Sequence, residues 1–420
     1  MTAMNLKSRI RFGLNKRLCW LGVLLASSVT PVHAATQEIR ALFQPDPAQP
    51  NKNVFINKTP NSGYCANYPD QCVENGMFSI QLPIRFDSIR PLNPSDVVAI
   101  QVPGNWRQLI VSNPETQETE TMEVRISGVG SEFHLSHPAT QLTGESDLLK
   151  AHQQLWINRS WVYAPLPCLY SGVGAYGPSS YRFFWKTPMA AYCTKSAAYY
   201  IPSMYFDTLD IAYELRTPNP LGMSTGIYTG SITYSVINRG DFDFGPMMQA
   251  SDGSITLDFV LDVQHTLKVD IPPGGNHVLL EPQGGWQGWL ESGRRPTRLY
   301  RDQTFNISAS SKFTMKLECE HDLGFGDGCA IMNRETGYAG AVDVSVSLPH
   351  GLTDSAGRPV RNVPLGRTAT APFQPGIYVD RKPGTLHFEV AEQYTNWLID
   401  NAGDKPYKGN ITVIWDSEVH

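Results

Sequence analysis

Two carboxylates near the middle of the chain are the first residues whose spacing suggests chemistry. Asp241 and Asp243 flank Phe242, and a pair of carboxylates can support glycoside hydrolysis. Residues two apart on a strand share a face, so a solvated strand edge explains the pair equally simply, and we favour that interpretation. The H-E-x-x-H motif and the Walker motif do not occur. We therefore predict that the protein is not an enzyme and uses no cofactor.

Aromatic side chains are concentrated in one segment, and this suits sugar recognition. Residues 156–206 hold 14 aromatic residues, whereas aromatic residues make up 10% of the whole sequence. A Tyr or Trp ring can stack on the C–H face of a sugar while polar groups bind its hydroxyls. The alternative, that these rings fill a large core, stays open. The candidate ligand contacts are Tyr176, Tyr181, Arg182, Trp185 and Tyr192.

The first 34 residues are predicted to be a secretory signal that is absent from the mature fold. An apolar run from Leu18 to Val29 precedes Val32-His33-Ala34, which fits a cleavage site. The segment holds five basic and no acidic residues, so the remainder carries a net charge of about −10, compared with −5 for the whole chain. Such a surface is a poor partner for nucleic acid. No later run reaches the roughly 20 apolar residues of a membrane span, so we expect an exported protein.

An even number of cysteines in an exported chain indicates disulfides. Cys19 leaves with the signal, and six cysteines remain. Zinc is the alternative, but neither C-x-x-C spacing nor a histidine pair accompanies these cysteines, so we expect no metal. Their spacing favours sequential pairs: Cys65–Cys72, Cys168–Cys193 and Cys319–Cys329.

Short runs of alternating hydrophobicity, separated by turn residues, predict an all-β fold. Helical spacing occurs at 146–158, where Ser146 is the expected cap, and at 391–400. The Pro- and Gly-rich segment 269–275 is the expected linker between a domain at 35–268 and a second at 276–420. Each domain is predicted to be an immunoglobulin-like β-sandwich.

One pattern occurs twice, and the chain continues differently after each copy. Residues 228–233 read YTGSIT and residues 407–412 read YKGNIT. A further strand-like run at 255–261 comes after the first copy, whereas the second copy is succeeded only by the strand that ends near Asp416. The second domain is therefore expected to lack its last strand and to need one from another molecule. Ile411, Val413 and Trp415 are the residues expected to face that strand.

A brief apolar stretch at 39–43 allows two interpretations. It is either a donor strand for another molecule or the first strand of the first domain. Pro45, Pro47 and Pro50 would break a longer donor, so we favour the first strand.

The strand from Tyr407 to Asp416 resembles the terminal strand of chaperone–usher pilus subunits, and the two-domain layout resembles the tip adhesins of these pili. Residues 282–287 and 386–390 are similar to a poorly characterised subgroup of enterobacterial fimbrial tip proteins. The resemblance is strongest over roughly 270–420. One departure is that many pilins link their first two strands by a disulfide, whereas here the cysteines are Cys319 and Cys329.

The resemblance implies a scheme of assembly and function. The second domain would be a pilin fold without its last strand, completed first by a periplasmic chaperone that holds the terminal carboxylate of His420. At the outer-membrane usher, the N-terminal extension of the next subunit would replace the chaperone. The first domain would bind a host-cell receptor, often a glycan, and the protein would be exported through the periplasm to the pilus tip at the cell surface.

Two other interpretations stay open. One is a minor structural pilin or assembly initiator without a receptor site. The other is a secreted carbohydrate-active enzyme.

Overall fold

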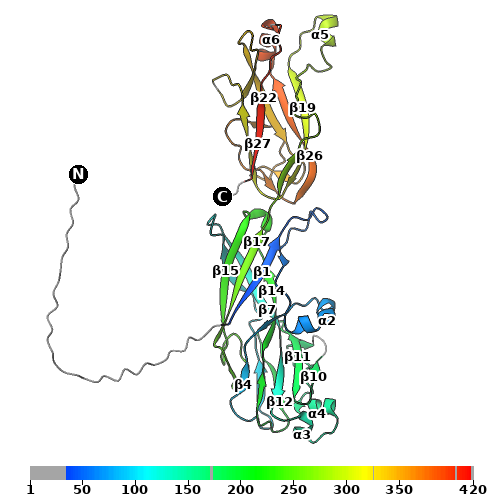
Figure 1. Cartoon of the computed structure of the whole chain (residues 1–420), viewed down its shortest axis with the longest axis vertical. Coiled ribbons are helices and arrows are strands. Elements are labelled where there is room, and N and C mark those ends of the chain that lie inside the picture. The colour runs from blue at the N-terminus through cyan, green and yellow to red at the C-terminus, as the bar shows by residue number, and fades with distance from the viewer. Residues whose placement is uncertain (1–34, 171–173, 325, 403, 418–420) are drawn as a thin grey trace, which may run out of the picture. The chain divides into compact units, whose positions relative to one another are not determined.

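The computed structural model describes residues 35–170, 174–324, 326–402 and 404–417. The sequence predicts an all-β fold, and the structure is mostly β, with strands arranged in several sheets and a few short helices (Figure 1). Every helix in these residues is too short or too polar to span a bilayer. Buried apolar side chains form two large cores, one from residues 39–263 and the other from residues 299–398. We call residues 35–263 the first β region and residues 267–417 the second β region.

The main sheet of the first region is ordered β16-β4-β13-β7-β6-β15-β17-β1-β2 along its longest path, with β3, β9, β10, β11 and β14 attached beside it. A smaller sheet has the order β5-β12-β8. The strands are β1 (Ala35–Phe43), β2 (Ile56–Asn57), β3 (Ile80–Leu82), β4 (Phe86–Ser88), β5 (Val97–Ile100), β6 (Arg107–Ser112), β7 (Thr119–Leu135), β8 (Trp156–Ile157), β9 (Leu169–Tyr170), β10 (Ala175–Tyr176), β11 (Ser180–Lys186), β12 (Cys193–Ala197), β13 (Met204–Phe206), β14 (Leu209–Arg216), β15 (Gly226–Ser235), β16 (Met248–Ala250) and β17 (Ser254–Val263).

The second region contains a sheet of order β18-β19-β26-β22-β21, with β24 paired to β22, and two separate strand pairs, β20–β27 and β23–β25. Val269 and Asp270, which the sequence places in a linker, lie in β18 and pair with β19. The strands are β18 (Leu267–Asp270), β19 (Leu299–Ala309), β20 (Phe313–Cys319), β21 (Cys329–Met332), β22 (Ala339–Ser347), β23 (Leu352–Thr353), β24 (Val363–Leu365), β25 (Gln374–Pro375), β26 (Val379–Val390) and β27 (Ile411–Ser417).

Period-2 alternation explains why these segments are strands. Along β17 the residues Ile255, Leu257, Phe259, Leu261 and Val263 are all buried, and the residues between them are partly exposed. Successive side chains of a strand point to opposite faces, so this pattern places one face in the core.

The stretch 39–43 is the first strand of this region, as we favoured from the prolines that follow it. β1 pairs in parallel with β17 and antiparallel with β2. Its buried residues Ile39, Ala41 and Phe43 join the first core.

Helices are few and short, and both helices predicted from the sequence are present. Asp147, and not Ser146, caps α4, because its carboxylate accepts the backbone N–H of Lys150 at 2.8 Å. The helices are α1 (Tyr64–Asn67), α2 (Pro69–Glu74), α3 (Ala139–Thr143), α4 (Leu148–Gln154), α5 (Gln287–Ser292) and α6 (Glu392–Asp400), with a 3₁₀ turn at Pro220–Gly222.

The three predicted disulfides are confirmed. They join Cys65 to Cys72, Cys168 to Cys193 and Cys319 to Cys329. The first links α1 to α2, and the third bridges the connection between β20 and β21.

Candidate functional site

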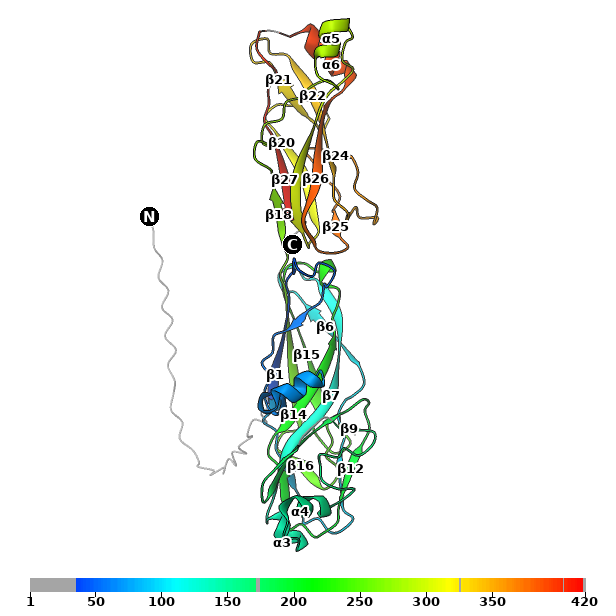
Figure 2. The same cartoon turned by 90° about the vertical axis from the view of Figure 1, so that its right-hand side faces the viewer.

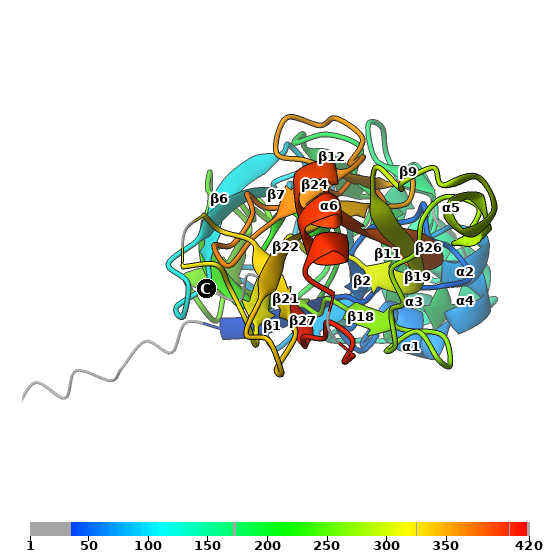
Figure 3. The same ribbon diagram turned by 90° about the horizontal axis from the view of Figure 1, so that it is seen from above.

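The strand β27 has a partner on one side only. It pairs antiparallel with β20 along its whole length, and no other strand in the described part of the chain pairs with it. β18 is likewise paired only with β19. Figures 2 and 3 show β18 and β27 on the same side of the second region. Each of these edges presents backbone N–H and C=O groups to which another strand can add.

The side chains that the sequence predicted to face a missing strand are half-buried. Ile411, Val413 and Trp415 pack against the second core but keep exposed surface. The Trp415 ring meets the ring of Phe305 edge-on, with centroids 4.8 Å apart. An apolar row that is half-covered can bury more surface if a further strand lies over it. The fourth predicted interface residue, His420, lies outside the described residues.

In the first region a strand occupies the corresponding place. β17 lies between β15, to which it is antiparallel, and β1, to which it is parallel. The repeated pattern aligns Tyr234 with Val413 and Val236 with Trp415. Tyr234 and Val236 are 0% and 1% exposed, whereas their counterparts on β27 are half-buried.

The repeated Tyr-x-Gly has the same structural role in both regions. The Tyr407 hydroxyl donates to the carbonyl of Asn401 at 2.9 Å, and the Tyr228 hydroxyl bonds the backbone of Ser224 and the carboxylate of Glu118. Each tyrosine therefore ties its strand to the chain just upstream.

The glycine of this pattern allows two strands to approach closely. A Cβ on Gly230 would overlap the carbonyl oxygen of Ile110, and a Cβ on Gly409 would lie 2.8 Å from the carbonyl oxygen of Ala330. Only glycine fits without moving a neighbouring backbone.

A second repeat, N-x-E-T, occurs at 113–116 and 333–336 and was not predicted above to have a structural role. The Oδ1 atoms of Asn113 and Asn333 accept backbone N–H groups two and three residues ahead, at 2.9 to 3.4 Å. Their Nδ2 atoms donate to the carbonyls of Thr225 and Lys405. Each asparagine closes one hairpin, β6–β7 or β21–β22. The two regions thus share a framework that extends beyond the Tyr-x-Gly pattern.

The five candidate ligand contacts do not form one site. Tyr176 and Tyr181 face each other across β10 and β11, with ring centroids 6.1 Å apart, and Arg182 follows on the opposite face of β11. Tyr181 and Trp185 are buried, and the indole N–H of Trp185 donates to the carbonyl of Trp161. Both are core residues. Tyr176 and Tyr192 are 43% and 42% exposed, so among the five candidates they are the two whose rings a ligand can reach.

Further aromatic and aliphatic side chains are exposed in the same stretch of sequence. They are Ile157, Tyr163, Leu166, Leu169, Tyr170, Met189 and Tyr200. Singly exposed apolar residues are common, and it is a contiguous apolar patch that is typical of an interaction surface.

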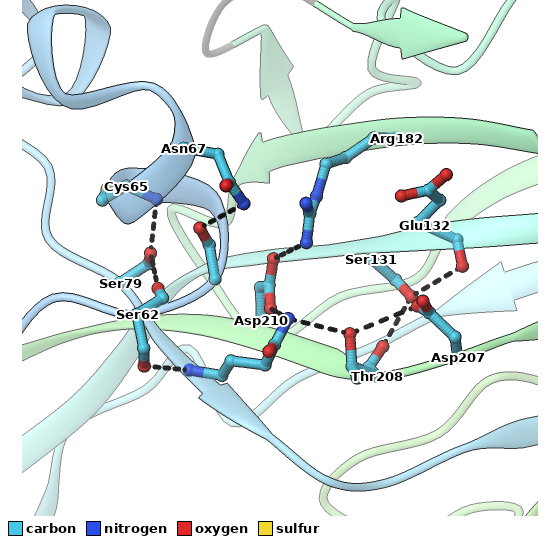
Figure 4. Close-up of polar contacts among 12 residues, drawn as sticks. Ser62, Cys65, Asn67, Ser79, Ser131, Glu132, Arg182, Asp207, Thr208 and Asp210 are labelled. Atoms are coloured by element: carbon cyan, nitrogen blue, oxygen red, sulfur yellow. Dashed lines mark hydrogen bonds and ion pairs between the residues drawn. The ribbon is translucent and has the colours of Figure 1, made fainter. Parts of the chain in front are cut away.

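Arg182 is engaged with a buried carboxylate (Figure 4). Its guanidinium lies 3.5 Å from Asp210, which also accepts the Gln81 amide at 3.1 Å. Burial raises the pKa of Asp210 to about 6, although Arg182 and Gln81 act in the opposite direction. A side chain on Gly63 would collide with Asp210, so the buried carboxylate lies directly against the chain that leads into α1.

Asp241 and Asp243 are held by structural hydrogen bonds. Asp241 pairs with the Arg107 guanidinium and accepts the backbone N–H and hydroxyl of Ser235. Burial alone would raise the pKa of Asp241, but these bonds outweigh it and the pKa is lowered. Asp243 accepts the Tyr192 hydroxyl at 2.6 Å and the N–H of Gly245 at 2.7 Å. A general acid of a glycosidase needs a raised pKa, whereas the pKa of Asp241 is shifted in the opposite direction.

Comparison with known proteins found no matching family model and no matching curated protein. Among solved structures, the chain matches CfaE, the adhesive subunit of CFA/I fimbria of enterotoxigenic Escherichia coli, with a TM-score of 0.27 and 9% identity. The alignment covers 92% of this chain and 94% of CfaE.

Two further matches are complexes with chaperones. One is a chaperone–tip adhesin complex of CFA/I fimbriae, with 10% identity, a TM-score of 0.25 and coverage of 92% and 97% of the two chains. The other is the CsuC–CsuE chaperone–tip subunit complex from archaic chaperone–usher Csu pili of Acinetobacter baumannii, with 8% identity, a TM-score of 0.21 and coverage of 91% and 98%. All three alignments are long, and all three superpose loosely.

Proposed function

We propose that the chain is the tip subunit of a chaperone–usher pilus. A receptor-binding domain of about residues 35–268 would precede a strand-accepting domain, and both would be immunoglobulin-like β-sandwiches. The observation that carries the proposal is the one-sided pairing of β27 beside the half-buried row Ile411, Val413 and Trp415. Addition of a strand would satisfy the backbone edge and bury the apolar row in one step.

The partners would act in sequence at this edge. A periplasmic chaperone would supply the strand first and would hold the carboxylate of His420. At the outer-membrane usher, the N-terminal extension of the next subunit would take its place. β1 of this chain pairs with β17 and β2, so it is used within the chain and is not free to complete another subunit. Acceptance of a strand without donation of one suits the pilus tip at the cell surface.

The first region suggests the register of the donated strand. Gly230 lies opposite Phe259, and Ile232 lies opposite Leu257. The repeat aligns these positions of β15 with Gly409 and Ile411. We therefore expect a large apolar residue of the donor over Gly409, and a second apolar residue two positions away opposite Ile411.

A peptide with the sequence of β17, SITLDFVLDV, provides the test. Unfolding of the purified chain would be followed by circular dichroism and tryptophan fluorescence with and without the peptide. We expect this peptide to raise the unfolding temperature of the second region. A control peptide of the same composition, with its apolar residues gathered in one block, cannot place alternate side chains on one face and should have no effect. A second region that is already stable and ignores the β17 peptide would mean that its fold is complete.

We propose a glycan as the receptor of the first region, with Tyr176 and Tyr192 as contacts. Their exposed rings and the neighbouring exposed side chains support this. Binding of the purified chain to a glycan array should weaken in Tyr176→Ala or Tyr192→Ala. Tyr338→Ala, which removes a ring that is 44% exposed in the second region, is the matched control. If the chain binds no glycan on the array but the β17 peptide stabilises the second region, the protein is better explained as a structural subunit or assembly initiator.

A further inference from the structure

We propose that Glu132, His134 and Asp207 form a binding site for a divalent transition-metal ion, with zinc as the expected occupant. Glu132 and His134 are two residues apart on β7 and therefore share a face. Asp207 follows β13, whose Tyr205 and Phe206 pair with His134 and Phe133 of β7. One ligand atom from each of the three side chains lies within 4.8 Å of the other two.

The spacing of the ligand atoms suits a shared ion better than a hydrogen bond. The Nε2 atom of His134 lies 3.6 Å from Oδ2 of Asp207, beyond the ~3.2 Å limit of an ordinary hydrogen bond. Two ligands bound to tetrahedral zinc at 2.0–2.2 Å are roughly 3.4 Å apart. An ion between these two atoms therefore needs only a small adjustment.

Neighbouring groups orient two of the three ligands. The His134 ring stacks on Tyr205, with centroids 4.9 Å apart and planes 20° apart. The second oxygen of Asp207, Oδ1, accepts the Thr208 hydroxyl at 3.2 Å. Contacts of this kind fix the direction of a ligand atom and thereby strengthen metal binding.

The charges around the site favour a cation. Glu132 and Asp207 are both carboxylates, and in the described part of the chain no Lys or Arg forms an ion pair with either. Arg182 of β11 lies opposite Glu132 of β7, but its guanidinium pairs with Asp210 (Figure 4). A divalent ion would therefore neutralise two neighbouring carboxylates whose one ion-pair partner among the described residues is the His134 imidazole.

The ligand types narrow the choice of ion. Imidazole nitrogen suits zinc, copper, iron and nickel, whereas magnesium and calcium prefer oxygen ligands. Three protein ligands leave a fourth position of a tetrahedral zinc open to water or to a group of a bound molecule. The inference is independent of the pilus proposal, because it rests only on side chains of the first region.

Titration of the full chain, purified without a histidine tag, with zinc chloride and cobalt chloride tests the site. We expect one ion per chain in calorimetry, visible absorption of bound Co²⁺ that zinc abolishes, and a higher unfolding temperature in zinc. His134→Ala, Asp207→Asn and Glu132→Gln should each weaken metal binding at least ~10-fold. Glu132→Gln keeps the shape of the side chain, so it tests the site even if His134→Ala proves unfolded.

His137→Ala is the matched control. This ring is three residues away and bonds Ser136, so its removal should leave the affinity unchanged. Binding that is absent in the native chain, or equally strong in folded His134→Ala and Glu132→Gln, would overturn the proposal.

Discussion

Asp210 should make the stability of the first region fall as pH rises through the acidic range. Its side chain is fully enclosed, and burial raises its pKa to about 6 from the ordinary 3.8. A carboxyl group whose pKa is raised by folding binds its proton more tightly in the folded chain, so its effect favours folding below pH 3.8 and is lost by pH 6. The full difference corresponds to about 3 kcal/mol, of which about 2 kcal/mol is lost between pH 4.5 and pH 7.5.

The measurement compares urea unfolding of the native chain and of Asp210→Asn across this range. Trp156, Trp161 and Trp185 are buried in the core of the first region, so tryptophan fluorescence includes a signal from that region. The native chain should lose about 2 kcal/mol relative to Asp210→Asn as pH rises from 4.5 to 7.5. Asp262→Asn, on β17, is the control and should show no such trend. A difference that is constant, or that favours the native chain at high pH, would refute the reasoning, because Arg182 would then hold Asp210 ionised.

Three further substitutions test the framework around these sites. Gly409→Ala should destabilise the second region by about 1–3 kcal/mol, because the new methyl group meets the backbone of β21. The control Gly376→Ala, with open space around the glycine, should destabilise it by less than about 1 kcal/mol. Equal effects of the two substitutions in denaturant unfolding would contradict the close approach at Gly409. Lys195→Met should destabilise the first region by about 3 kcal/mol, because the buried ammonium group binds three backbone carbonyls at 3.1–3.3 Å; an unchanged unfolding midpoint would show that these bonds contribute nothing. Replacement of both Cys319 and Cys329 by alanine should destabilise the second region by about 3 kcal/mol by the loop-entropy relation; unchanged denaturant unfolding of this variant would show that the disulfide does not stabilise the region.

Local patterns allowed the strands and the edge of the second region to be predicted. Alternation along 254–263 and the recurrence of Tyr-x-Gly are each visible within a few residues. The alternation reflects a buried strand face, and the recurring glycine reflects a close approach of two backbones. The disulfides were predictable because each pair is close in sequence.

The sequence did not allow us to predict which aromatic residues are buried, because their burial depends on segments far away in the chain. Phe184 and Trp185 point to opposite faces of β11, yet both are buried. Tyr64 of α1, more than a hundred residues earlier, stacks on Phe184 with centroids 4.8 Å apart. When other segments pack on both faces of a strand, its aromatic rings are buried and cannot contact a ligand. The sequence of the strand alone does not show that a distant segment packs on its second face. The cluster of Glu132, His134 and Asp207 was hidden for the same reason, since strand pairing alone brings residue 207 to residue 134.

The comparison between the two regions separates a framework from the strands that cover it. Both contain the tyrosine tether, the close-approach glycine and the asparagine hairpin, so β15 and β27 begin from the same local geometry. Tyr234 and Val236 are nevertheless enclosed, whereas Val413 and Trp415 are not. β17 pairs with β15 along Gly226–Ser235, which includes Tyr234, whereas in the described part of the chain β27 has no strand beside its second edge. On the proposed function, we expect a partner strand with alternate apolar side chains to pair with the free edge of β27 as β17 pairs with β15.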